Sequence, residues 1–130
     1  MDYSLEVQER FRSSEGAGEF AEGAPGVVTG EAEDRTLNVW FRFQIEFAGS
    51  AIRTVKYRVF GCPHSIAAAA WVADALPGSE VEALDELDTH GLLRRLDAPI
   101  EKLGKLLVLE DALRRCRKQI ANFDRARNGI

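Results

Sequence analysis

Residues 61–65, Gly61-Cys62-Pro63-His64-Ser65, join a strand pattern to a helix pattern, and this junction decides the fold. Before it, residues 55–60 alternate apolar and basic side chains, which is typical of a half-buried strand. After it, residues 63–76 are rich in alanine and begin with a proline, which is tolerated in the first turn of a helix. The sequence therefore predicts a strand, a tight turn and a helix in direct succession.

Cys62 is expected at the N-terminus of this helix. The helix dipole and the free backbone N–H groups there favour a thiolate, the form of cysteine that attacks sulfur and binds metals. A second interpretation stays open, in which Cys62 is a small buried apolar residue.

The composition is that of one globular domain spanning residues 1–130, with 45% hydrophobic and 29% charged residues. A formal net charge of −4 argues against nucleic-acid binding, and no apolar run is long enough for a membrane span. The N-terminus lacks a signal-peptide pattern, so we expect the cytoplasm. Only two cysteines occur, which argues against a secreted disulfide framework and against a zinc site of paired Cys-x-x-Cys type. One disulfide between Cys62 and Cys116 stays open, because the sequence does not give their separation.

Upstream of the junction, residues 1–30 are predicted as a short helix over 3–12 and a loop over 13–30. Residues 27–29 in that loop are compatible with a short edge strand. The clearest alternation covers residues 37–47, which place apolar side chains on one face and polar ones on the other. Residues 48–50 form a turn, so we predict an antiparallel β-hairpin within residues 35–60.

Downstream, residues 62–125 are predicted to be helical. Short charged helices cover residues 79–97 with a break near 89–91, and one long helix starts at Leu103. Cys116 falls in the apolar stripe of the long helix and is expected in the core. The fold class is therefore α+β: a small antiparallel sheet of about three strands, with helices packed on one face.

The order of these parts resembles the U-type iron–sulfur cluster assembly scaffolds, the family that has the IscU and NifU amino-terminal fold. The resemblance covers residues 3–123 and rests on short motifs in the family's order: Tyr3-Ser4, Gly18-Glu19-Phe20, Val59-Phe60-Gly61-Cys62, Pro77-Gly78 and Leu109-Glu110-Asp111-Ala112-Leu113. It implies a scaffold-like protein of iron–sulfur cluster assembly. It also implies a cysteine desulfurase or other assembly proteins as partners.

The resemblance also implies where a cluster or zinc ion would bind. Family members use three cysteines and an aspartate, which correspond here to Thr36, Asn38, Cys62 and Lys105. Only Cys62 of this set is able to bind a soft metal, because such sites need several thiolates or imidazoles at one point. We therefore expect neither zinc nor an iron–sulfur cluster to bind tightly, although the family resemblance allows for both.

Three functions remain open at this point. In the first, the chain is a degenerate scaffold that accepts sulfur on Cys62 or provides one ligand to a cluster shared between chains. In the second, it is an interaction module of the same fold that binds no cluster. In the third, it is a small thiol enzyme that uses Cys62. Nothing in the sequence resembles an oxyanion hole or an orienting acid, so we expect no enzyme. His64 and His90 are both expected to be exposed. The oligomeric state does not follow from the sequence.

Overall fold

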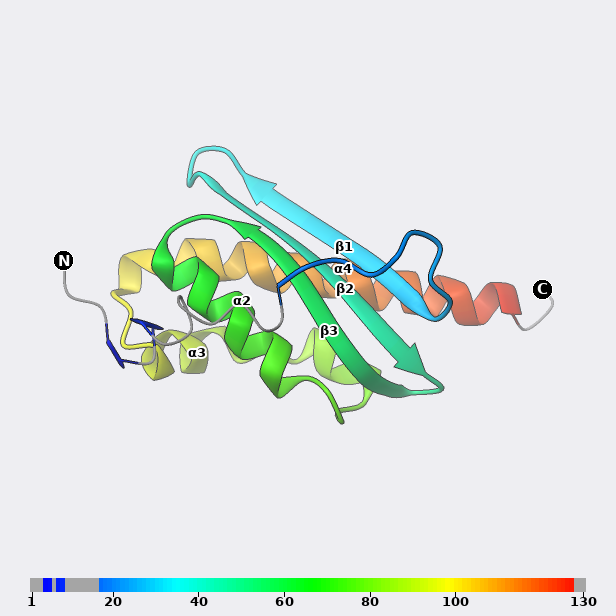
Figure 1. The fold of residues 1–130 in the computed structure, drawn as a ribbon. Helices are drawn as coiled ribbons and strands as arrows, with labels where there is room; N and C mark the ends of the chain where they lie inside the picture. The colour runs from blue at the N-terminus through cyan, green and yellow to red at the C-terminus, as the bar shows by residue number, and fades with distance from the viewer. Residues whose placement is uncertain (1–3, 6, 9–16, 128–130) are drawn as a thin grey trace.

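The computed structural model describes residues 4–5, 7–8 and 17–127 of the chain (Figure 1). Most of the predicted helix over residues 3–12 lies outside the described residues. The described elements are three strands, followed by a series of helices that ends in the longest one.

The sheet contains β1 (Val27–Asp34), β2 (Val39–Ala48) and β3 (Ala51–Phe60) in the order β1-β2-β3, with both pairs antiparallel. Side chains of β2 alternate between buried and partly exposed, since one face of the sheet packs on the core. The tight β2–β3 connection confirms the predicted hairpin.

Strand β1 is longer than predicted. The chain forms eight residues of strand where the sequence suggested a loop with a three-residue strand. The buried positions of β1 include Gly30 and Ala32, whose small side chains give no strong apolar alternation. Pairing with β2, in which Gly30 lies opposite Phe43, is what extends the strand.

The helical part contains α2 (Pro63–Ala75), α3 (Thr89–Arg95) and α4 (Leu103–Arg127), with short 3-10 turns at η1 (Val81–Asp85) and η2 (Ile100–Lys102). The break predicted near residues 89–91 lies slightly earlier, at residues 86–88, because α3 begins at Thr89. The Asp88 side chain accepts a hydrogen bond of 2.9 Å from the Gly91 N–H and so caps the helix.

Helix α4 packs along β1 and β2, whereas α2 packs on β3 (Figure 1). The closest approach is at Gly30, where an added Cβ atom would lie 2.7 Å from the Cys116 nitrogen and 2.8 Å from its sulfur. Cys116 is fully buried, as predicted, and belongs to a hydrophobic cluster that joins the sheet to all three helices. None of the helices in the described part of the chain is long and apolar enough to span a membrane.

Candidate functional site

Cys62 is the N-cap residue of α2, as the junction in the sequence predicts. Its backbone is extended, with φ −78° and ψ 169°, and Pro63 follows as the first helical residue. The Cys62 carbonyl accepts the first helical hydrogen bond, of 3.1 Å, from the Ile66 N–H. The side chain is partly exposed, and its Sγ lies 3.6 Å from the hydroxyl oxygen of Ser65.

The pKa of the Cys62 thiol lies below its ordinary value. Partial burial raises this pKa, but the other contributions outweigh burial. These are hydrogen bonding with the Ser65 side chain and backbone, and the positive charges of Lys105 and Lys102. The structure therefore brings Lys105 close enough to Cys62 to stabilise the thiolate.

Thr36 and Asn38 lie in the exposed turn between β1 and β2. Asn38 has a positive φ of 56°, a conformation that asparagine tolerates better than most residues. Two glycines show how closely this turn packs against the site. A Cβ atom added to Gly61 would lie 3.2 Å from the Val39 side chain, and one added to Gly104 would lie 3.1 Å from the Leu37 side chain. The turn is therefore packed against the ends of β3 and η2–α4, where Cys62 and Lys105 are found.

These residues do not fit a metal or cluster site within one chain. The set offers one thiol, one hydroxyl, one amide and one ammonium group, whereas iron–sulfur clusters and zinc need several thiolates or imidazoles. Among the described residues, no three His, Cys, Asp or Glu side chains are grouped so that they could hold a metal ion. Lys105 adds positive charge at the position where a cation would bind.

His64 is buried, and the prediction that it is exposed is wrong. It is the second residue of α2, and its side chain faces the segment that contains Asp97, Lys102 and Lys105. Burial lowers the pKa of His64, the two lysines lower it further, and Asp97 opposes them. His64 is thus a neutral buried imidazole behind the site. His90 is exposed, as predicted.

Sequence reasoning missed two members of the site, Ser65 and Lys102. Ser65 could have been found, because it is the third residue after the N-cap and that spacing brings side chains of the first turn together. Lys102 had no such signal, since it belongs to a separate 3-10 turn that the fold brings to Cys62.

Comparison with known proteins identifies relatives of the whole chain. The "Iron-sulfur cluster assembly protein 3" of Arabidopsis thaliana is 26% identical over 128 residues, covering 98% of this chain and 75% of the relative. The "Iron sulfur cluster assembly protein 1" of Trachipleistophora hominis is 23% identical and covers 87% of this chain and 82% of the relative.

A solved structure has the same fold. The N-terminal part of a nitrogen-fixing NifU-like protein from Brucella abortus superimposes with a TM-score of 0.72 at 14% identity. The match covers 92% of this chain and 94% of that one. The family model for the NifU-like N terminal domain matches residues 2–127. Since that match spans nearly the whole sequence, the chain belongs to the NifU-like N-terminal domain family.

Proposed function

We propose that this protein acts in iron–sulfur cluster assembly as a scaffold-like sulfur acceptor, with Cys62 as the residue that carries the sulfur. The observation that carries the proposal is the environment of Cys62. The thiol is partly exposed, lies at a helix N-terminus, has a serine hydroxyl at 3.6 Å and is flanked by two lysine charges. These features favour a nucleophilic thiolate and disfavour a bound cation.

In the proposed step, the Cys62 thiolate attacks the terminal sulfur of a persulfide on a donor protein. A new S–S bond forms on Cys62 while the S–S bond of the donor breaks, and the donor cysteine leaves as a thiolate. The terminal sulfur carries its proton with it, so the reaction needs no external oxidant or reductant. The product is a persulfide on Cys62.

The neighbours of Cys62 have separate roles in this step. Ser65 donates a hydrogen bond to the thiolate, and Lys105 and Lys102 stabilise negative charge on the thiolate and then on the persulfide. His64 stays neutral and buried, so it adds no third positive charge to the site. In this proposal the protein accepts one sulfur atom on Cys62 and does not turn over a substrate, so it is not itself an enzyme.

The partners in this proposal are a cysteine desulfurase, which supplies the persulfide, and other proteins of cluster assembly. The names of the relatives from Arabidopsis thaliana and Trachipleistophora hominis support this class of partner. The two free cysteines suit a reducing compartment, and we propose the cytoplasm.

The test is sulfur transfer followed by mass spectrometry of the intact protein. The parent protein is incubated with a cysteine desulfurase and L-cysteine, and a thiol-blocking reagent then traps persulfides. We expect a gain of one sulfur atom, located on Cys62 by peptide mapping, in both the parent and a Cys116→Ala variant. The gain should disappear in Cys62→Ser. If the parent gains no sulfur, or if sulfur is found on Cys116, the proposal fails and a non-cluster-binding interaction module is the better description.

A further inference from the structure

The outer face of the sheet, which points away from the helices, has an unusual row of side chains. Three consecutive cross-strand pairs follow one another along β2 and β3: Trp40 with Phe60, Arg42 with Arg58, and Gln44 with Lys56. The row begins two residues before Cys62 and combines an aromatic pair with three positive charges. Phe60 is 59% exposed, a large value for a phenylalanine.

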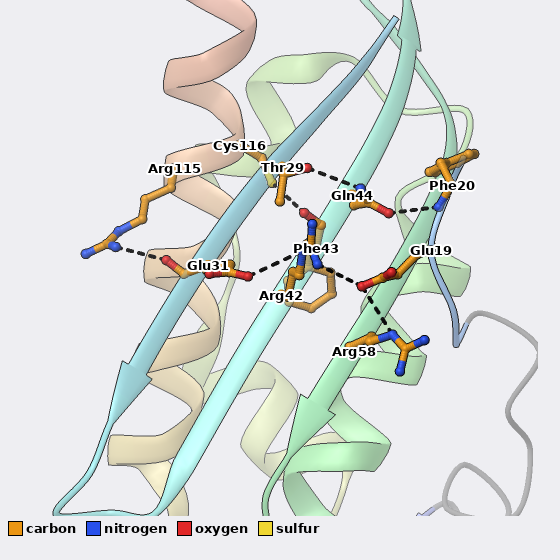
Figure 2. Close-up of polar contacts among 10 residues, drawn as sticks. All are labelled: Glu19, Phe20, Thr29, Glu31, Arg42, Phe43, Gln44, Arg58, Arg115 and Cys116. Atoms are coloured by element: carbon orange, nitrogen blue, oxygen red, sulfur yellow. Dashed lines mark hydrogen bonds and ion pairs between the residues drawn. The ribbon is translucent and has the colours of Figure 1, made fainter. Parts of the chain in front are cut away.

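The pairing of Arg42 with Arg58 is unfavourable by itself. Like charges directly opposite each other on neighbouring strands repel, so this pair is a poor choice for sheet stability. The repulsion is relieved by Glu19, whose carboxylate oxygen lies 2.7 Å from Arg42 Nη1 and 3.3 Å from Arg58 Nε (Figure 2). Glu31 adds a second carboxylate, 3.3 Å from Arg42 Nε.

Glu19 belongs to residues 17–24, which we name the strap. The strap runs across β3 and β2 and reaches the start of β1 (Figure 1). Next to Glu19, the Phe20 ring lies 4.6 Å from the Lys56 ammonium. The Phe20 N–H donates a 2.8 Å hydrogen bond to Gln44 (Figure 2). The strap thus presents an acidic residue and an aromatic residue in succession to the second and third pairs of the row.

Besides its side-chain contacts, the strap is joined to β3 by a 2.9 Å backbone hydrogen bond from the Gly18 N–H to the Tyr57 carbonyl. Its ion pairs are partly exposed, with Glu19 at 38% and Arg58 at 57%, and exposed ion pairs contribute little to stability. A cavity of about 400 Å³ lies between the strap and the sheet, lined by strap residues and by Thr29, Arg42 and Gln44. Within the described part of the chain, the strap contacts given above all fall on the second and third pairs of the row.

We propose that this row is a docking surface for an acidic segment of a partner protein, one that contains an aromatic residue next to a carboxylate, and that the strap occupies it in the free protein. The charges of the surface fit such a segment, because the strap itself binds there through Glu19 and Phe20. The row has Phe60 at one end, two residues before Cys62, so a docked partner that extends along the row past the strap's contacts approaches the thiol. The inference rests on the sheet face alone and does not require sulfur transfer.

The test uses a fluorescent synthetic peptide that copies residues 17–24, titrated into the full chain. A Glu19→Ala/Phe20→Ala variant frees the surface, and we expect it to bind the peptide about tenfold more tightly than the parent does. Glu22→Ala is the matched control, because Glu22 is an exposed acid of the same strap, and its affinity should equal that of the parent. Adding Arg42→Gln to the Glu19→Ala/Phe20→Ala variant should abolish peptide binding. A peptide with glutamine in place of its first glutamate, the one that copies Glu19, should not bind either.

Several results would overturn the proposal. If the Glu19→Ala/Phe20→Ala variant binds the peptide no better than the parent does, the strap only stabilises the sheet and occupies no docking surface. Binding that survives Arg42→Gln would place the peptide elsewhere. A dimer of the parent, seen by light scattering and lost in Glu19→Ala, would make a second copy's strap the occupant. Circular dichroism checks that each variant is folded. If the Glu19→Ala/Phe20→Ala variant is unfolded, Phe20→Ala alone takes its place, and we expect it too to bind the peptide more tightly than the parent does.

Discussion

Cys62 Sγ and Ser65 Oγ lie 3.6 Å apart across the first turn of α2. Both residues belong to one turn of helix, so this contact requires no metal and no partner chain. A serine hydroxyl at this place donates to a thiolate but adds no negative charge, unlike the thiolates of a cluster site. The local geometry therefore favours one reactive thiol over a set of metal ligands.

Alkylation should distinguish the two cysteines. We expect Cys62 to react with iodoacetamide under native conditions and Cys116 to remain unmodified. Cys62 is partly exposed and has a lowered pKa, whereas burial raises the pKa of Cys116 to about 12. Peptide mapping after a short reaction gives the answer. Faster modification of Cys116 would mean that α4 turns a different face to the sheet.

Replacing Lys105 should make Cys62 less reactive. In Lys105→Met the alkylation rate of Cys62 should fall at neutral pH, by roughly twofold to tenfold, and its pH midpoint should rise, because one positive charge near the thiolate is lost. Lys102→Met should act in the same direction. The control is Lys118→Met, an exposed lysine elsewhere on α4, which should leave the midpoint unchanged. Equal midpoints in the parent and Lys105→Met would rule out an activating role for this lysine.

Gly30→Ala should destabilise the fold. The new methyl group would meet the backbone of Ala112 and both the nitrogen and the sulfur of Cys116, so β1 and α4 would have to move apart. We expect a loss of about 1–3 kcal/mol in the free energy of unfolding. Gly104→Ala is the control, because its methyl group meets only the movable Leu37 side chain and alanine favours a helix. Urea unfolding of both variants measures the difference, and an unchanged Gly30→Ala midpoint would contradict this packing.

Alkaline pH should destabilise the protein through Cys116. Above the ordinary thiol pKa the unfolded chain loses this proton, whereas the folded chain keeps it up to a pKa of about 12. The native state then binds more protons, so the free energy of unfolding falls as pH rises, by about 1.4 kcal/mol per pH unit in that window. The parent and Cys116→Ala are compared by denaturant unfolding at pH 8 and pH 10, which are roughly the lower and upper ends of the range in which an ordinary thiol loses its proton. The variant should lose less stability over this interval, and an identical loss would assign the effect to other groups.

The sequence was sufficient for the hairpin and for the position of Cys62. Strict alternation in residues 37–47 and the proline after Cys62 are local signals, and the structure follows them. The full length of β1 was not predictable in this way, because Gly30 is small for a packing reason that only its close approach to α4 explains. When a strand forms mainly because its neighbours pair with it and pack on it, its own sequence shows only a weak alternation of apolar and polar residues.

The surroundings of Cys62 depended on tertiary structure. Lys105 was expected near the thiol from the family resemblance, but the approach of Lys102 from η2 and the burial of His64 were not expected. A histidine next to a helix start is exposed in an isolated helix. Here tertiary packing around the start of α2 covers it, and no local pattern in the sequence indicates that packing.

Anaerobic reconstitution with iron and sulfide tests a one-thiol site most directly. Iron, zinc and acid-labile sulfide are measured per chain in the parent and in Thr36→Cys/Asn38→Asp/Lys105→Cys, which restores the family's ligand set. We predict that the parent holds no stoichiometric metal or cluster and that the rebuilt variant gains it, because three thiolates and a carboxylate replace one thiol and a lysine. Stoichiometric metal or cluster in the parent, lost in Cys62→Ser, would contradict this account.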